Sequence, residues 1–150
     1  MSALSDALYD YAVVPVIVLG SPDQAEPLGD ALIAGGLPVA EVTFRSPAAL
    51  EGIRRMASAY PDLLIGAGTV STTAQAAEAV AAGAKFVVTP GFNPEVVDFC
   101  ITQGIPIFPG ISGTGEIEAA ISRGLDVVKF FPAEPLGGTD MLKALSGPYP

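Results

Sequence analysis

The sequence predicts an α/β fold with a parallel sheet, and three features of the chain carry that prediction. Half of the 150 residues are apolar and only 15% are charged, as expected for strands buried on both faces. Short runs rich in β-branched and aromatic residues alternate with alanine-rich segments of helical spacing. The connections between them are short, which implies parallel strands joined by right-handed crossovers.

Six apolar runs are predicted to form the strands. They lie at residues 13–19, 39–45, 63–70, 85–90, 106–111 and 127–132. Three helix starts are predicted where a capping side chain directly precedes a proline, at Ser21, Ser46 and Asn93. Helix ends are predicted at glycines that accept a left-handed backbone, namely Gly35, Gly36, Gly83, Gly104 and Gly124. The chain therefore consists of six βα units.

Two architectures accommodate six βα units, an open doubly wound sheet and a (β/α)₈ barrel. An open sheet can be built from the six predicted strands alone, whereas a barrel needs eight strands and typically about 250 residues. Length alone therefore favours the open sheet, with residues 1–150 forming one domain. No strand followed by a GxGxxG turn and a helix indicates a dinucleotide site.

Charge and composition exclude several classes of function. A net charge of −9 without a basic stretch argues against binding to nucleic acid. No apolar run approaches the roughly 20 residues of a membrane span, and the N-terminus lacks a basic signal region. We therefore expect a cytoplasmic protein with no membrane partner. The single cysteine, Cys100, lies in an apolar helical pattern and is expected in the core.

The chain contains no histidine, which removes much of the catalytic repertoire. Serine or cysteine hydrolase machinery and histidine-ligated zinc are excluded, and acid–base chemistry must use Glu, Asp, Lys or Tyr. Carboxylates alone can bind Mg²⁺, but no tight cluster of Asp and Glu indicates such a site. We expect neither a metal nor a cofactor.

Lys129 is the first candidate for chemistry, because it interrupts the apolar run 127–132. Burying an ammonium is costly, and a desolvated lysine amine is a usable nucleophile. The alternative is a lysine whose stem is buried while its ammonium reaches water. Strand alternation in the run 39–45 places Glu41, Thr43 and Arg45 on one face, where three polar groups are hard to explain structurally.

These side chains fit a reaction in which the lysine attacks a ketone. The carboxylate of Glu41 would move protons, and Arg45 would hold a substrate carboxylate through paired hydrogen bonds. The alternative is an internal ion pair of Glu41 with Arg45 or Lys129 that only neutralises buried charge. Buried pairs stabilise proteins poorly, so we favour the catalytic interpretation.

Five motifs in the chain resemble those of the 2-keto-3-deoxy-6-phosphogluconate (KDPG) and 4-hydroxy-2-oxoglutarate (KHG) aldolase family. They follow the order and spacing of that family over nearly the whole chain, at 41–45, 66–70, 89–91, 108–112 and 129–134. The resemblance implies a (β/α)₈ barrel and so overrules the open sheet. Only about six of its βα units are present, so residues 1–150 are expected to be a (βα)₆ portion of an aldolase barrel.

The resemblance also implies roles for individual residues. Lys129 matches the lysine that forms the Schiff base, and Glu41 matches the general acid and base. Arg45 and Thr69 match positions that bind the pyruvate carboxylate, while Pro90 and Phe131 match positions that line the pocket. From the residues alone, Thr69 reads as a turn residue and Phe131 as a core residue.

The implied activity is the reversible cleavage of KDPG to pyruvate and glyceraldehyde 3-phosphate, without cofactor or metal. The implied assembly is a homo-oligomer, a trimer in the family. Because the chain stops after its sixth βα unit, we expect strands seven and eight to be missing, and with them most of the phosphate site. Two alternatives therefore stay open: an impaired fragment that acts as an assembly scaffold or half-barrel, and a phosphosugar isomerase or epimerase that uses Glu41 without a covalent intermediate.

Overall fold

A computed structural model describes residues 3–149 of the chain. Its elements alternate between strands and helices, as the sequence predicts. The helices are α1 (Ala3–Tyr11), α2 (Ala25–Ala34), α3 (Ala49–Ala59), α4 (Thr73–Ala81), α5 (Pro94–Thr102), α6 (Thr114–Ile121) and α7 (Gly138–Leu145), with 3₁₀ turns η1 (Pro22–Gln24) and η2 (Glu134–Leu136). The strands are β1 (Val16–Ile17), β2 (Val39–Thr43), β3 (Leu64–Gly68), β4 (Phe86–Val88), β5 (Ile107–Phe108), β6 (Gly110–Ile111) and β7 (Lys129–Phe130).

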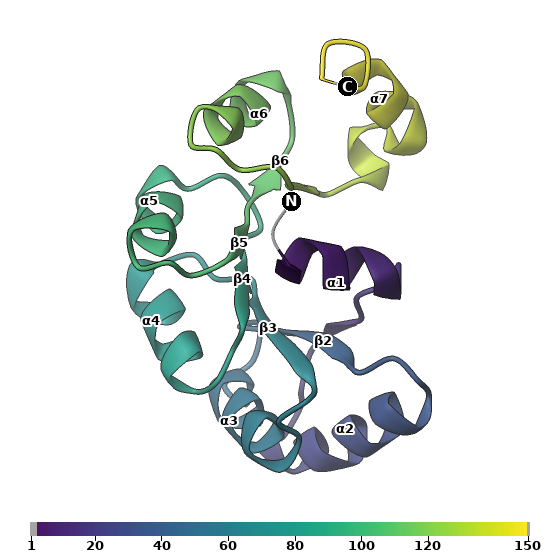
Figure 1. Ribbon diagram of the computed structural model, residues 1–150, viewed down its shortest axis with the longest axis vertical. Coiled ribbons are helices and arrows are strands. Elements are labelled where there is room, and N and C mark those ends of the chain that lie inside the picture. The colour runs from purple at the N-terminus through teal and green to yellow at the C-terminus, as the bar shows by residue number, and fades with distance from the viewer. Residues whose placement is uncertain (1–2, 150) are drawn as a thin grey trace.

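Every strand pairs in parallel with its neighbour in the chain. Strands β1 to β5 form one sheet in sequential order, and β6 pairs with β7 in a second. Helices α2 to α6 follow the outer side of this row of strands, so that the molecule forms an open arc (Figure 1). Sequential parallel strands with helices on the outside are the arrangement of a (β/α)-barrel wall.

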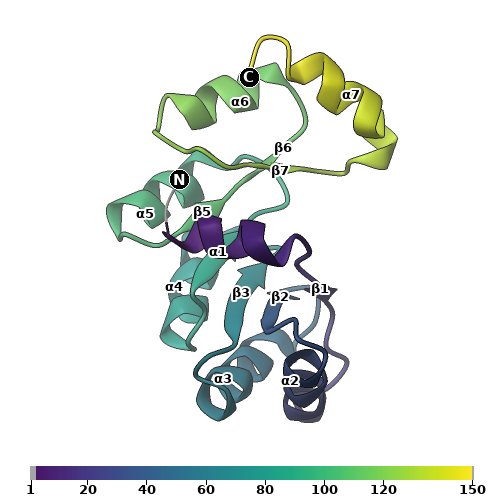
Figure 2. The same cartoon turned by 45° about the vertical axis from the view of Figure 1, so that its right-hand side comes forward.

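The register of the strands separates their two faces. The outward face packs on the helices through Ala40, Val42, Ile65, Ala67 and Val87, all nearly fully buried. The inward face carries every second residue, and paired positions bring Glu41 beside Gly66 and Gly110 beside Lys129. Helix α1 lies on this inner side, across the strands from α4 (Figure 1), and it crosses in front of the strands in the turned view (Figure 2). The functional candidates Glu41 and Lys129 thus both belong to the interior of the arc.

Two of the three predicted helix caps are confirmed. The Ser21 hydroxyl accepts a hydrogen bond from the backbone N–H of Asp23, and the Asn93 side chain accepts one from the N–H of Glu95. The prediction for Ser46 is wrong, because α3 begins only at Ala49 and the residue before it, Ala48, has no capping side chain. A turn between the Ser46 carbonyl and the N–H of Ala49 takes up the intervening residues.

The predicted helix-ending glycines are confirmed at four sites. Gly36, Gly83, Gly104 and Gly124 all have positive φ, between 67° and 109°, and Gly35 closes α2 with a right-handed backbone. The predicted strand at 106–111 is divided, however, into β5 and β6. Pro109 stands between them and has no N–H to donate to a neighbouring strand, while its carbonyl accepts from Lys129 N at 2.9 Å.

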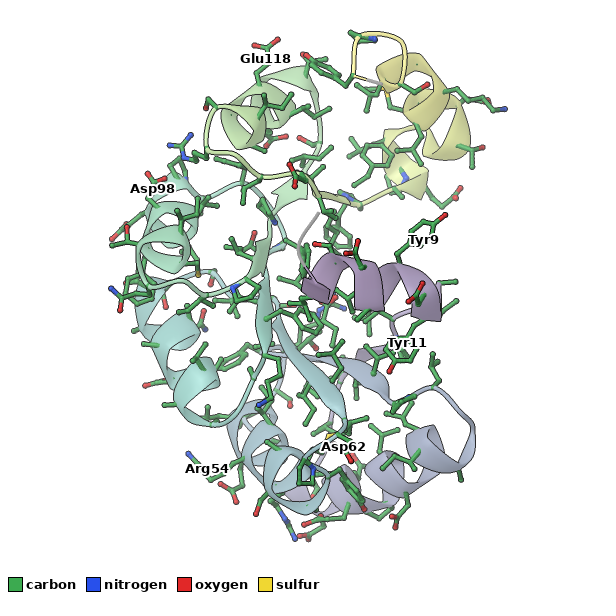
Figure 3. All side chains as sticks on the ribbon, in the orientation of Figure 1. Tyr9, Tyr11, Arg54, Asp62, Asp98 and Glu118 are labelled. Carbon is green, nitrogen blue, oxygen red and sulfur yellow. The ribbon has the colours of Figure 1, made fainter. Side chains whose placement is uncertain are left out.

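The charged residues lie mainly on the outer helices. Arg54, Asp98 and Glu118 extend from the outer faces of α3, α5 and α6 (Figure 3). The pKa of Asp98 is lowered by its hydrogen bonds to the Arg123 guanidinium, and this ion pair ties α5 to the segment after α6. Among residues 3–149, no helix has both the length and the apolar character of a membrane span.

Candidate functional site

The centre of the candidate site is an ion pair between β2 and β7. Lys129 Nζ lies 3.1 Å from Glu41 Oε1 and 3.3 Å from Oε2. The two strands are not neighbours in either sheet, so the pair crosses the interior of the arc. The Glu41 side chain is only 6% exposed and is therefore held in place by its surroundings and its partner. Each group can pass a proton directly to the other over this distance.

Lys129 is less buried than the sequence predicts. Its side chain is 25% exposed, and residues 127–131 are half-buried rather than enclosed. The reason is that β7 pairs with β6 on one side and, within the described part of the chain, with no strand on the other. The ammonium also lies 5.3 Å from the centre of the Phe131 ring, a cation–π contact that places Phe131 at the site.

A second pair of predicted site residues meets where β2 and β3 end. Arg45 Nε donates a hydrogen bond of 3.3 Å to the Thr69 hydroxyl. Thr69 has a φ of 57°, a left-handed conformation that is uncommon for a β-branched residue. Thr69 directly follows Gly68, the last residue of β3. The turn that ends β3 therefore also directs the Thr69 hydroxyl towards Arg45. Arg45 is exposed, and its remaining N–H groups can bind an anion.

The predicted common face of Glu41, Thr43 and Arg45 is only partly correct. Strand β2 ends at Thr43, so Arg45 lies beyond the strand and does not follow its alternation. Thr43 is fully buried, and its hydroxyl donates to the Ile17 carbonyl at 2.7 Å. It therefore ties β2 to β1 instead of facing a ligand. Of the three polar groups, only Glu41 reaches Lys129.

Pro90 lies in a different hollow from the Glu41–Lys129 pair. It is exposed after β4 and borders a cavity of about 350 Å³, together with Val70, Ser71, Asn93 and Glu116. This cavity lies among the segments that follow the carboxyl ends of β3, β4 and β6. Glu116 accepts hydrogen bonds there from the backbone N–H groups of Ser112 and Gly113. Burial alone would raise the pKa of the Glu116 carboxyl, but these hydrogen bonds outweigh it and lower the pKa.

An apolar cavity of about 400 Å³ adjoins the ion pair itself. Glu41 and Lys129 line it together with Val16, Phe86 and Phe108 from the inward faces of the strands. Residues Leu8 and Tyr9 of α1 close one side of it. Apolar surroundings strengthen interactions between charges, because little water is present to screen them.

Two positions near the site lie in the family motifs but were assigned no role from the sequence. Thr89 is 1% exposed, and its hydroxyl donates to the Gly91 carbonyl at 2.7 Å and accepts from Gly110 N at 3.3 Å. Gly68 lies against the Glu41 carboxylate with no space for a side chain. Both act through contacts between distant segments, which strand alternation does not reveal. No group of three metal-ligating side chains comes together among residues 3–149.

Comparison with known proteins gives consistent results. A family model described as KDPG and KHG aldolase matches residues 4–150. The chain is 52% identical over 149 residues to the 2-dehydro-3-deoxy-phosphogluconate aldolase of Treponema pallidum, covering 99% of this chain and 71% of that protein. The corresponding enzyme of Haemophilus influenzae is 49% identical over 144 residues, covering 96% of this chain and 68% of that protein.

Solved structures agree with the sequence relatives. The KDPG aldolase of Legionella pneumophila, with pyruvate captured as a covalent carbinolamine intermediate, matches with a TM-score of 0.88 at 43% identity, over 91% of this chain and 66% of that one. The KDPG aldolase of Zymomonas mobilis ZM4 with 3-phosphoglycerate matches with a TM-score of 0.86 at 37% identity, over 91% of this chain and 65% of that one. The predicted fold class, that of a (β/α)₈ barrel family, is confirmed. The chain belongs to the KDPG and KHG aldolase family.

Proposed function

We propose that this protein is a class I aldolase that reversibly cleaves KDPG to pyruvate and glyceraldehyde 3-phosphate. The observation that carries the proposal is the contact of Lys129 Nζ with both carboxylate oxygens of Glu41, at 3.1 and 3.3 Å. A primary amine beside a carboxylate in an apolar cavity is suited to forming and resolving a Schiff base. The covalent pyruvate adduct in the Legionella pneumophila relative supports the same chemistry.

The first half of the reaction forms the iminium. Proton transfer from the Lys129 ammonium to Glu41 leaves a neutral amine, which attacks the substrate C2 carbonyl carbon. The resulting carbinolamine then loses its hydroxyl as water, with Glu41 supplying the proton. The first transfer takes place over the observed distance between Lys129 Nζ and Glu41 Oε1, and the same carboxylic acid then gives a proton to the departing hydroxyl of the carbinolamine, which is bonded to C2 beside the Lys129 nitrogen.

The second half breaks the carbon–carbon bond. Glu41 removes the proton of the C4 hydroxyl, C4 becomes the aldehyde carbon, and the electrons of the C3–C4 bond pass to the iminium nitrogen. The aldehyde leaves, and the remaining enamine is protonated at C3. Water then hydrolyses the iminium, which releases pyruvate and returns Lys129 to its free amine.

The other predicted residues serve binding in this proposal. Arg45, oriented by Thr69, would hold the carboxylate of the 2-keto acid by charge-assisted hydrogen bonds. Phe131, which contacts the Lys129 ammonium, would cover the keto end of the substrate. Pro90 would border the path of the aldehyde portion, since its cavity lies among the segments after the strand ends.

Trapping with pyruvate and borohydride tests the Schiff base directly. We expect intact-mass analysis to show one reduced pyruvyl adduct on the parental chain, and peptide mapping to place it on Lys129. Lys129→Met should form none, whereas Lys143→Met, which removes an exposed lysine of α7, should react like the parent. An adduct that persists in the folded Lys129→Met variant contradicts the proposal.

Pyruvate release from KDPG, followed by coupling to lactate dehydrogenase, tests the complete reaction. Pyruvate release that is abolished by Lys129→Met supports the aldolase. Conversion of a phosphosugar that yields no pyruvate and survives Lys129→Met favours an isomerase or epimerase. A folded chain that forms the adduct but releases no pyruvate from KDPG favours the impaired fragment. Running KHG in parallel identifies the preferred aldehyde partner.

We further infer a homo-oligomer located in the cytoplasm, with the trimer as the form that the family resemblance implies. The net charge of −9 argues against nucleic acid as a partner. Light scattering coupled to size exclusion decides the number of subunits, and a monomer at micromolar concentration contradicts the trimer.

A further inference from the structure

Gly68, the last residue of β3, lies directly against the side chain of Glu41. The three atoms nearest to a β-carbon built on Gly68 all belong to Glu41 and would overlap it: Oε1, Cγ and Cδ. Gly68 is buried, and its Cα pairs in register with Thr43, two residues beyond Glu41 on β2. Its φ is not among the positive ones, so the backbone does not require a glycine here. What this position requires is the space that a side chain would fill.

The preceding inward-facing glycine of β3 accommodates a different neighbour. A β-carbon on Gly66 would overlap the ring of Phe86, which fills the interior beside it. Strand β3 thus presents two glycines to the interior, each opposite a large side chain from an adjacent strand. This is the usual alternation of small and large residues inside a barrel, but at Gly68 the large neighbour is a reactive carboxylate.

We propose that Gly68 is a positioning residue, whose missing side chain keeps open the space from which the Glu41 carboxylate reaches Lys129. This inference rests on the proposed function, because it assigns Gly68 to the proton transfers of that reaction. The Glu41 carboxylate is enclosed by Gly68 on one side and by the Lys129 ammonium on the other. A methyl group at residue 68 would push the carboxylate away from the amine.

The side chain of Glu41, and not the strand, would yield to such a methyl group. The three atoms nearest to the methyl group would all belong to the side chain of Glu41, and two of them, Oε1 and Cδ, lie in its terminal carboxylate. Strands β2 and β3 would keep the hydrogen bonds that pair them over five positions. A Gly68→Ala variant is therefore expected to fold and to lose the geometry of the ion pair.

The experiment compares Gly68→Ala in two backgrounds, the parental chain and Glu41→Ala. The second background removes the three atoms that lie nearest to the methyl group, Oε1, Cγ and Cδ of Glu41. In the parental background we expect the rate of reductive trapping with pyruvate to fall at least about tenfold, because positioned general acid–base groups contribute about 10²–10⁴-fold. In the Glu41→Ala background the same change should alter the slow residual rate by less than about twofold.

Thermal unfolding of the same four chains gives a readout that is independent of activity. Gly68→Ala should lower the melting temperature when Glu41 is present and leave it unchanged or raised when residue 41 is alanine. Gly115→Ala is the matched control, since a β-carbon on Gly115 meets nothing within 4 Å. This control should keep the parental rate, and as a helical alanine it should not lower the melting temperature.

Several outcomes decide between the explanations. A Gly68→Ala chain that traps pyruvate at the parental rate overturns the inference, as does an equal loss of melting temperature in both backgrounds. If Gly68→Ala fails to fold, recovery of folding in the Glu41→Ala background supports the inference, and no recovery overturns it. A parental chain that forms no adduct contradicts the proposed function, and the melting temperatures then still decide whether Gly68 acts through Glu41.

Discussion

Arg45 and Thr69 join the ends of β2 and β3 through a hydrogen bond of 3.3 Å between the guanidinium Nε and the hydroxyl oxygen. The contact fixes one edge of the guanidinium and leaves its terminal N–H groups free to meet a carboxylate as a pair. Lysine cannot reproduce that arrangement, because it offers a single point charge on a flexible stem.

Substituting Arg45 therefore tests binding separately from chemistry. We expect Arg45→Lys to raise the KM for pyruvate in the trapping reaction by about tenfold or more, because a hydrogen bond to a charged group contributes about 1.5–3 kcal/mol. The maximal trapping rate should change much less. Arg54→Ala, which removes an exposed arginine of α3, is the control. A fall in maximal rate at unchanged KM would contradict a binding role.

The ion pair between Glu41 and Lys129 should also be visible in stability. Lys129→Met leaves the nearly buried Glu41 carboxylate without its cation, so we expect the free energy of unfolding to fall by about 1–3 kcal/mol. Adding Glu41→Gln to this variant should recover part of the loss, because the uncompensated charge is then gone. Urea titrations of the two single variants and the double variant measure the effect. Strictly additive losses would show that the pair does not interact.

Thr69 is expected to show a conflict between stability and activity. Its left-handed backbone costs a non-glycine residue about 1–2 kcal/mol, so Thr69→Gly should stabilise the fold by up to about 1 kcal/mol after the added chain entropy is counted. The same change removes the hydroxyl that Arg45 contacts and should weaken pyruvate binding. Ala12→Gly, at a φ of 59°, is the control for backbone strain alone. Melting curves and trapping rates together separate the two effects.

Thr89 connects the segment after β4 to β6 through its buried hydroxyl. Thr89→Val keeps the shape but leaves the Gly110 N–H and the Gly91 carbonyl without this partner, so we expect a loss of about 1–3 kcal/mol. Thr89→Ser keeps the hydroxyl and should lose less than Thr89→Val. Thr102→Val, at an exposed helical site, provides the comparison. Equal stability of Thr89→Val and the parent would show that the hydroxyl is not needed.

Cys100 should be chemically inert in the folded protein. Burial raises the pKa of its thiol to about 11, so the thiol stays protonated at pH 8, and thiolate is the reactive form. We expect no reaction with a disulfide reagent at pH 8 in native buffer and complete reaction in urea. Because the unfolded thiol ionises at lower pH than the folded one, this group also favours unfolding as the pH rises above about 9. Rapid labelling of the native chain would contradict the buried position.

The sequence predicted those features that local patterns determine. Alternation in β2 identified Glu41 as an inward polar residue, and the apolar run around Lys129 identified its partner. Capping side chains and glycines marked the ends of several helices, because each satisfies backbone groups a few residues away. The resemblance to the aldolase family then corrected the open sheet that chain length had favoured.

The remaining features depend on contacts between distant segments. Arg45 leaves the face of Glu41 because β2 ends at Thr43, and that boundary depends on pairing with β3. The half-exposed position of Lys129 depends on what lies beside β7, which no pattern within residues 127–132 reveals. Gly68 and Thr89 gain their importance only from neighbours brought to them by the fold. Local sequence therefore indicated the reactive groups but not the residues that hold them in position.

The Glu41–Lys129 contact spans 88 positions of the chain, which links activity to the time course of folding. Within each of the two sheets, strands pair only with their neighbours in the sequence, so they can be added one after another as the polypeptide emerges from the ribosome. The Lys129 amine contacts the Glu41 carboxylate only after β7 has been added, which is after β1 to β6. Reaction with pyruvate would then report the arrival of β7. During refolding, this reactivity would appear later than the helical signal in circular dichroism.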